Sequence, residues 1–320
     1  MNKIEFKRIH TDYVNQALEL VLSAFVKEKQ SVPFLPKQQE FYSFIEEAIS
    51  NLFAIGNGLM AIENDELVGF IVGFEIKEFF GKTKGIYVPL FGHGLKNSYD
   101  QLYTELYKRV AELWVKDDFM MHAINIFAHD KKTINEWFWM GFGMRCVDSI
   151  KEISLSDKND YLTDIIIKKV TEKDLPILGE LHKSHNEYYR SSPIFMPTVD
   201  EDPIMDLTEW CQKKDHHLWA AFHEGKPLGY MRIQPDGESV ISRSKTMMNI
   251  TGGFVTATER SKGIGQLLLK EIENWLYHNN YPLLGVDFES INITGSQFWN
   301  KHFTKYTYSL VRRIDERIKY

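Results

Sequence analysis

A stripe of apolar residues at helical spacing stands out between residues 263 and 278. It consists of Ile264, Leu268, Ile272, Trp275 and Leu276, with Leu267 and Leu269 beside it and Lys270, Glu273 and Asn274 opposite. A period of 3.6 residues predicts an amphipathic helix over 263–278. Ahead of it, an apolar run predicts a strand over 247–255. A short glycine-containing loop joins the two.

The same reading predicts the other elements of the second half. Strands are expected at 165–170, 217–222, 227–234, 283–289 and 304–314, and helices at 172–189, 201–213 and 292–301. Strands and helices in this order favour a sheet covered by helices.

The two halves of the chain repeat one plan with a period of roughly 160 residues. Phe6–Asp12 resembles Ile167–Asp174, since each reads as a short strand followed by a helix start. The matching hairpins are Leu59–Phe70 and Leu218–Tyr230, and the pairs Asp130/Trp137 and Asn292/Trp299 lie 162 residues apart. The polar stretch 154–160 is rich in turn formers. We therefore expect domains at 1–153 and 161–320, with a linker between them.

Composition narrows the class of protein. A chain of 320 residues that is 43% hydrophobic and 26% charged is long enough for two globular domains. A net charge of −6 and a pI near 6.0 argue against nucleic-acid binding through a broad basic surface. Only Cys146 and Cys211 are present, and the first residues lack the apolar run of a signal peptide, so we expect a reducing cytoplasm. The sequence contains no run of eighteen uninterrupted apolar residues, so it predicts no membrane span.

The loop Arg260-Ser261-Lys262-Gly263-Ile264-Gly265 carries the clearest chemistry. Glycines let the backbone approach a bulky anion, the first helical turn leaves N–H donors unpaired, and two cationic side chains add positive charge. The order R-x-x-G-x-G differs from a P-loop, which needs Lys-Ser or Lys-Thr after its last glycine, and from a dinucleotide fingerprint, which needs a third glycine. The loop therefore predicts a phosphate site.

With this loop, the second half resembles the GNAT-type N-acetyltransferases. Arg260 lies five residues after Val255, where the family's fourth strand enters its pyrophosphate loop, and Asn292–Phe303 is similar to the family's Asn-led helix. The resemblance implies an α/β fold of the α+β type. It further implies two tandem GNAT-like domains, each a mixed, mostly antiparallel twisted sheet flanked by helices.

The resemblance also implies acetyl-CoA as the donor. Its pyrophosphate would bind the N–H groups of Lys262–Gly265, and its pantetheine arm would pair like an extra strand beside Phe254 and Val255. The residues implied for the cofactor site are Phe254, Val255, Arg260, Ser261, Lys262, Gly263, Ile264, Gly265, Asn292 and Trp299.

The first half resembles the family only in outline. We expect its corresponding turn at Val88–Lys96, which lacks the Arg-led spacing. A turn with fewer cationic groups should hold pyrophosphate poorly. The first half is therefore interpreted as a degenerate GNAT domain that walls the substrate cleft or supports its twin.

Transfer of acetyl to an amine needs a base, an oxyanion donor and a proton for the thiolate. Strand alternation over 283–289 puts Glu289 and Asp287 on one polar face, with Glu289 our first candidate for the base and Asp287 the second. The family's usual tyrosine, seven residues after Asn292, is Trp299 here. Tyr306 and Tyr308 are therefore candidates for the acid, and protonation of the thiolate by solvent is the alternative. The histidines show no paired metal-ligand spacing, and we expect no metal.

The leading hypothesis is acetyl-CoA-dependent transfer to a primary amine of a small molecule or peptide, directly within a ternary complex. A non-catalytic acyl-CoA-binding regulatory module is the alternative, because the tyrosine is missing. Aminoacyl transferases that use charged tRNA also pair GNAT-like domains, but they lack R-x-x-G-x-G, and this acidic chain predicts no nucleic-acid partner. The sequence names neither the acceptor nor the oligomeric state, and it leaves a homodimer open.

Overall fold

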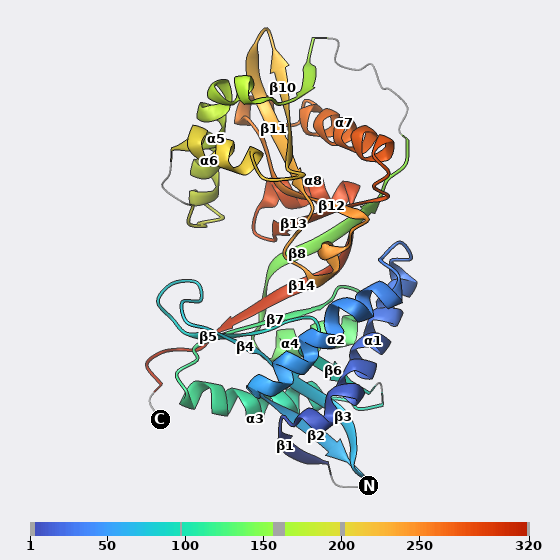
Figure 1. Cartoon of the computed structure of the whole chain (residues 1–320). Coiled ribbons are helices and arrows are strands. Elements are labelled where there is room, and N and C mark those ends of the chain that lie inside the picture. The colour runs from blue at the N-terminus through green and yellow to red at the C-terminus, as the bar shows by residue number, and fades with distance from the viewer. Residues whose placement is uncertain (1–3, 97, 156–163, 199–201, 319–320) are drawn as a thin grey trace. The chain divides into compact units, whose positions relative to one another are not determined.

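The structure is a computed structural model of the chain that describes residues 4–96, 98–155, 164–198 and 202–318. The chain divides into two compact units, which can be followed by colour in Figure 1. Unit 1 comprises Met1–Val147 and Lys305–Tyr320, and unit 2 comprises Asp148–Thr304. None of the helices in the described ranges is long and apolar enough to cross a membrane.

This division differs from the predicted domains 1–153 and 161–320 at both ends of the second domain. Residues 148–153 group with unit 2, and residues 305–320 group with unit 1. A strand joins whichever sheet offers it paired backbone and a buried face, whatever its place in the chain. Of the predicted linker, residues 156–160 lie outside the described ranges.

Unit 1 begins with β1 and two long helices. Its elements are β1 (Glu5–Arg8), η1 (Thr11–Tyr13), α1 (Val14–Ser31), α2 (Gln38–Ile55), β2 (Gly58–Glu63), β3 (Glu66–Val72), β4 (Phe74–Ile76), β5 (Gly85–Val88), β6 (His93–Leu95), α3 (Leu102–Lys116), β7 (Met121–Phe127), α4 (Lys131–Trp139), the start of β8 (Gly143–Glu152), and β14 (Thr304–Arg313) from Lys305 on.

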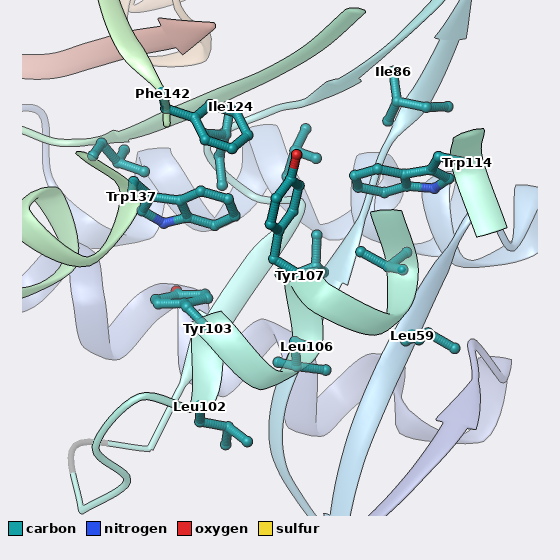
Figure 2. Close-up of a cluster of buried hydrophobic side chains, with 14 of the residues drawn as sticks. Leu59, Ile86, Leu102, Tyr103, Leu106, Tyr107, Trp114, Ile124, Trp137 and Phe142 are labelled. Carbon is teal, nitrogen blue, oxygen red and sulfur yellow. The ribbon is translucent and has the colours of Figure 1, made fainter. Parts of the chain in front are cut away.

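Two groups of strands build unit 1. Strands β1, β2, β3 and β6 pair in that order and are antiparallel. In the second group β4 pairs with β5, β5 pairs in parallel with β7, and β7 pairs antiparallel with β14. Figure 2 shows the core, in which Tyr107 of α3 lies among Trp114, Trp137 and Phe142. Burial of these large aromatic side chains is a major source of the unit's stability.

Unit 2 confirms the predicted order of elements. It contains β9 (Ile166–Lys169), η2 (Glu172–Asp174), α5 (Leu175–Arg190), α6 (Pro203–Cys211), β10 (His217–His223), β11 (Lys226–Gln234), η3 (Val240–Arg243), β12 (Met247–Val255), η4 (Ala257–Glu259), α7 (Ile264–His278), β13 (Leu283–Glu289) and α8 (Ile293–His302). Each strand and helix predicted in 165–301 is present within three residues of its expected ends.

The sheet of unit 2 has the order β13-β12-β11-β10-β9, parallel between β12 and β13 and antiparallel elsewhere. Strand β10 alternates its contacts: Leu218 and Phe222 join the core under α5 and α6, while Trp219 meets Trp275 of α7. The stripe of α7 is buried as predicted, with Leu268, Ile272 and Leu276 fully enclosed. The fold is thus a mixed, mostly antiparallel sheet with helices packed on it.

Candidate functional site

Strands β12 and β13 separate halfway along their length. Their parallel pairing runs from Met247 opposite Leu283 to Ile250 opposite Val286, and no pair follows it among the described residues. On its other edge β12 stays paired with β11, with a register shift that passes over Thr251. Beyond Ile250, one edge of β12 therefore offers main-chain donors and acceptors that an extended ligand can pair with.

The Arg260–Gly265 loop follows that open edge and leads directly into α7. Gly263 precedes the helix with φ +89°, Ser261 has φ +63°, and no side chain caps the helix. Successive N–H groups at a helix start with alternating backbone handedness form an anion-binding concavity. The backbone here has a conformation that can bind an anion.

Cationic groups flank the loop in different ways. Nε of Arg260 donates to the carbonyl of Val255 at 3.1 Å, and its guanidinium lies 4.4 Å above the Tyr188 ring. Lys262 pairs with Glu259 at 3.2 Å on the surface. Arg260 is therefore fixed by the protein, whereas Lys262 is held by a solvent-screened pair of small energetic worth.

Helix α8 packs against the start of α7, next to the loop. A Cβ on Gly265 would lie 3.3 Å from the Phe298 ring, so a glycine allows α7 and α8 to pack closely. Asn292 caps α8 by accepting the N–H of Gly295 at 3.0 Å. Trp299 is buried, and a Cβ on Gly253 would lie 3.5 Å from its ring. The residues predicted for the cofactor are thus gathered around one strand end and one helix start.

Asp287 and Glu289 lie on the part of β13 that has separated from β12, and both are half-buried. Removal from water raises the pKa of Asp287 to about 8, and the negative charges of Glu238, Asp148 and Glu289 add to this. Burial also raises the pKa of Tyr189 to about 12, with Asp287 the next contributor. The acidic side chains thus form one cluster, whose negative charge favours a positive ligand.

Tyr306 and Tyr308, which were predicted as candidates for the acid, lie in a different unit from Asp287 and Glu289. Both follow Thr304 and lie in β14, which belongs to unit 1. Tyr308 pairs with Ile126 of β7 and packs against the unit 1 core, and Tyr306 is fully buried. Nearness to Trp299 in sequence did not fix the sheet partner of this strand, because strand pairing is non-local.

Sequence reasoning missed Tyr188 at the end of α5. Its hydroxyl donates to Oδ1 of Asn292 at 2.8 Å, and its ring contacts Phe254 at a centroid distance of 6.1 Å. The neighbouring pair Tyr188-Tyr189 at a helix end was the only available signal, and aromatic residues there are usually core.

Unit 1 contains a counterpart of the Arg260–Gly265 loop, at residues 98–103. The offset of 162 residues places Ser98–Tyr103 opposite Arg260–Gly265, and Gln101 precedes α3 with φ +59° as Gly263 precedes α7. One oxygen of Glu136 accepts the N–H and the hydroxyl of Thr104 at 2.7 and 2.8 Å. The protein's own carboxylate therefore occupies the start of α3.

The turn expected at Val88–Lys96 is not where the helix begins. The chain bends after Val88 and then forms β6, whose residues His93–Leu95 pair with β3. Pro89 and Gly92 mark this bend, which in sequence is indistinguishable from a strand-to-helix turn. The true counterpart, Ser98–Tyr103, has Asp100 in place of Lys262 and lacks both glycines.

Comparison with known proteins agrees with this geometry. Residues 179–300 match the model of the acetyltransferase (GNAT) family. A GCN5-related N-acetyltransferase from Sphaerobacter thermophilus shares 11% identity over 99% of this chain and 98% of that chain, with a TM-score of 0.59. No curated protein matches the chain.

A second similar structure is the GCN5-related glucosamine N-acetyltransferase region of a fungal multi-domain GH3 beta-N-acetylglucosaminidase. It shares 13% identity with a TM-score of 0.53, and the match covers 97% of this chain but only 38% of that one. At such identities the structural likeness shows a shared fold. Residues 179–300 are therefore a domain of the acetyltransferase (GNAT) family, and the fold that this chain shares with the Sphaerobacter thermophilus protein agrees with that.

Proposed function

We propose that unit 2 transfers the acetyl group of acetyl-CoA directly to a primary amine of a small molecule or peptide. The observation that supports this best is the uncapped start of α7, with Ser261 and Gly263 at positive φ, immediately after the open edge of β12. In unit 1, Glu136 accepts a hydrogen bond at the start of the corresponding helix, so of these two loops the one in unit 2 is the better candidate for a diphosphate.

In this proposal the donor lies along β12 and ends on the loop. N–H groups of Lys262–Gly265 bind the pyrophosphate, and the pantetheine pairs with the main chain beside Phe254 and Val255. Asn292 and Trp299 line the same strand end from α8. A backbone N–H near Val255 then serves as the oxyanion donor.

Asp287 and Glu289 bind the ammonium of the acceptor and are the candidates for its first deprotonation. A carboxylate whose pKa is about 8 matches that task near neutral pH, which moves Asp287 ahead of Glu289. The negative charge of this acidic cluster supports a cationic acceptor. Tyr188, bonded to Asn292, replaces Tyr306 and Tyr308 as our candidate to protonate the thiolate.

Unit 1 is proposed to be a degenerate GNAT domain with a structural or substrate-cleft role. Ser98 and Asp100 replace the cationic residues, and Glu136 occupies the helix start. Cys146 and Cys211 form no disulfide in the part of the chain that the structure describes, and we infer a reducing cytoplasm for the protein.

Titration calorimetry with acetyl-CoA tests the donor site. We expect Gly263→Asp to weaken binding at least about tenfold, since a carboxylate would face the pyrophosphate. Gly263→Asn is the control for backbone strain, because Asn tolerates positive φ without charge. Gln101→Asp makes the matching change in unit 1 and should leave binding unchanged. Equal affinity of wild type and Gly263→Asp would overturn the site.

A second candidate function is a non-catalytic acyl-CoA-binding module, which Trp299 in the family's tyrosine position favours. A screen of primary amines for acetyl-CoA-dependent release of free thiol separates the two. Thiol release with any amine supports the transferase. Tight acetyl-CoA binding with no release across mono-, di- and polyamines and peptide N-termini supports the binding module.

A further inference from the structure

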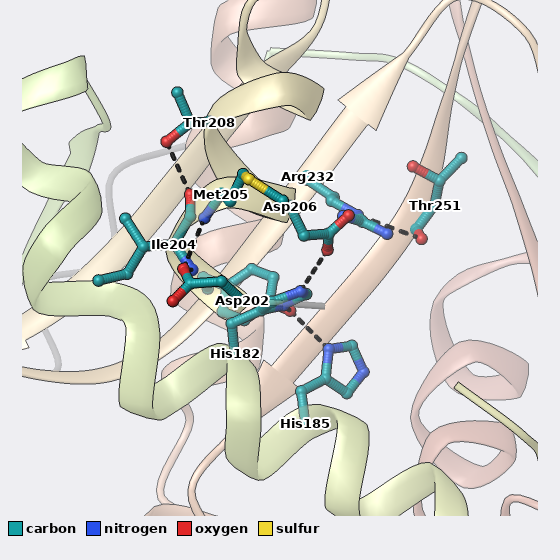
Figure 3. A network of polar contacts seen from close by, with 10 residues as sticks. His182, His185, Asp202, Ile204, Met205, Asp206, Thr208, Arg232 and Thr251 are labelled. Carbon is teal, nitrogen blue, oxygen red and sulfur yellow. Dashed lines mark hydrogen bonds and ion pairs between the residues drawn. The ribbon is translucent and has the colours of Figure 1, made fainter. Parts of the chain in front are cut away.

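A row of four hydrogen-bonded side chains links α5, α6 and β11 in unit 2. His182 Nδ1 and His185 Nδ1 lie 2.8 and 2.6 Å from the hydroxyl of Tyr230, and His182 Nε2 lies 2.6 Å from Oδ2 of Asp206. Figure 3 shows the two histidines and Asp206 in this arrangement. The first three are buried, whereas the Asp206 side chain is 42% exposed. The row thus leads from the interior of unit 2 to solvent.

The donor and acceptor capacity of each group fixes the direction of these hydrogen bonds. An ionised Asp206 only accepts, so His182 Nε2 carries a hydrogen. Burial lowers the pKa of both histidines, that of His185 to about 3, and both rings are therefore neutral. Nδ1 of His182 must then accept the Tyr230 hydroxyl, whose oxygen accepts Nδ1–H of His185. Nε2 of His185 is left as a proton acceptor.

This nitrogen belongs to a ring that packs on the open end of β12. The His185 ring stacks on Phe254 of β12 with centroids 5.0 Å apart and planes 24° apart. Its other neighbour is Tyr189, at 4.7 Å, a residue affected by the charges of Asp287 and Glu289. His185 therefore contacts Phe254, on the strand that would hold the thioester, and Tyr189, which the acidic residues that would bind the amine influence.

We propose that His185 Nε2 takes a proton from the amine nitrogen as the amide bond forms, and that Tyr230, His182 and Asp206 relay a proton to solvent. His185 is the catalytic group in this scheme, and the other three are positioning and relay residues. The inference rests on the proposed acetyl transfer and extends it, because neither histidine was needed to explain the donor site.

The protons balance in this scheme. An ammonium that becomes an amide loses two protons while the C–S bond breaks and the C–N bond forms. The carboxylate of Asp287 or Glu289 takes the first proton, which ends on the departing thiolate by way of Tyr188 or directly. His185 Nε2 takes the second and gives its Nδ1 proton to Tyr230, Tyr230 gives its own to His182 Nδ1, and His182 gives Nε2–H to Asp206. Neither ring stores a charge, as their burial requires.

Steady-state kinetics on the full chain tests the relay. We expect Tyr230→Phe and Asp206→Asn each to lower kcat about 10- to 100-fold with the KM for acetyl-CoA unchanged. Asp202→Asn is the matched control, since Asp202 is an exposed acid on the same helix whose N-capping role Asn can fill. The solvent deuterium isotope effect on kcat should change in Tyr230→Phe and persist in the control. Unchanged kcat and isotope effect in both relay variants would overturn the inference.

Nitrogen-15 NMR of the imidazole rings provides a readout that needs no turnover. The relay requires His185 protonated on Nδ1 and His182 protonated on Nε2, and Tyr230→Phe should disturb both signals. A wild-type His185 protonated on Nε2 would contradict the inference. If wild type releases no thiol with any amine, the proposed function fails and the relay's role with it. Thiol release with unaffected relay variants would reject the relay alone.

Discussion

Single residues decide the chemistry of this site, and Asp287 shows how far sequence reasoning reaches. Alternation along β13 correctly places Asp287 and Glu289 on the same side of the strand. Their order of preference depended on neighbours that sequence did not bring together. Glu238 lies beyond β11 and Asp148 lies in β8, yet both raise the pKa of Asp287. Such a shift requires the tertiary structure.

Asp287→Asn should alter how stability depends on pH. The pKa of Asp287 is raised in the folded state, so its contribution is full below about pH 4 and is lost as the pH rises through about 8. Wild type should therefore lose at least about 1 kcal/mol relative to Asp287→Asn between pH 5 and pH 8.5. Urea unfolding at both pH values measures this. Glu271→Gln, which removes an exposed acid of α7, should show no such trend, and an identical trend in both variants would reject the assignment.

At the scale of elements, local pattern was sufficient for most of unit 2. The stripe of α7 and the apolar run of β10 are properties of neighbouring residues, and the predicted helix and strand are both confirmed. The expected turn at Val88–Lys96 was wrong because a kinked strand with Pro89 and Gly92 resembles a loop in sequence. The repeat could have predicted the correct turn, because an offset of 162 residues from Gly263 leads to Gln101, the residue that precedes α3.

The start of α5 provides a test of a capping contact. Asp174 accepts from the N–H and hydroxyl of Thr171 at 2.9 and 2.8 Å, and hydrogen bonds from Lys168 and Thr171 lower the pKa of Asp174 to about 2. Asp174→Ala should cost about 1 kcal/mol at pH 7.

Because the pKa of Asp174 is depressed, its contribution is present above about pH 4 and is lost as the pH falls through about 2. Chemical unfolding of wild type and Asp174→Ala should therefore converge near pH 2. Asp12→Ala is the matched control in unit 1, where the carboxylate is exposed and makes no capping box. A cost that is the same at both pH values would contradict this account.

On the scale of the whole molecule, the partner of the last strand could not be predicted. The pattern of 304–314 correctly gives a strand, but its sheet is chosen by contacts with residues far away in sequence. Leu310 pairs with Ile124 and is fully buried in the unit 1 core. The boundary at 304/305 follows from that pairing rather than from composition.

Leu310→Ala tests this assignment. A cavity in the unit 1 core should cost about 2–5 kcal/mol. Hydrogen exchange should then speed up in β7 and α3, while α7 keeps its protection. Leu268→Ala, a buried leucine of α7, is the matched variant and should show the reverse. Loss of protection confined to α7 in Leu310→Ala would contradict the division into units.

Strand β14 also imposes an order of events on synthesis. The ribosome synthesises residues 305–313 only after the whole of 148–304. Unit 1 therefore lacks its last strand until all residues of unit 2 have been made. Until then β7 lacks its β14 neighbour, and its exposed edge needs shielding from other polypeptides. Chaperone dependence should therefore centre on the part of the protein that is made first.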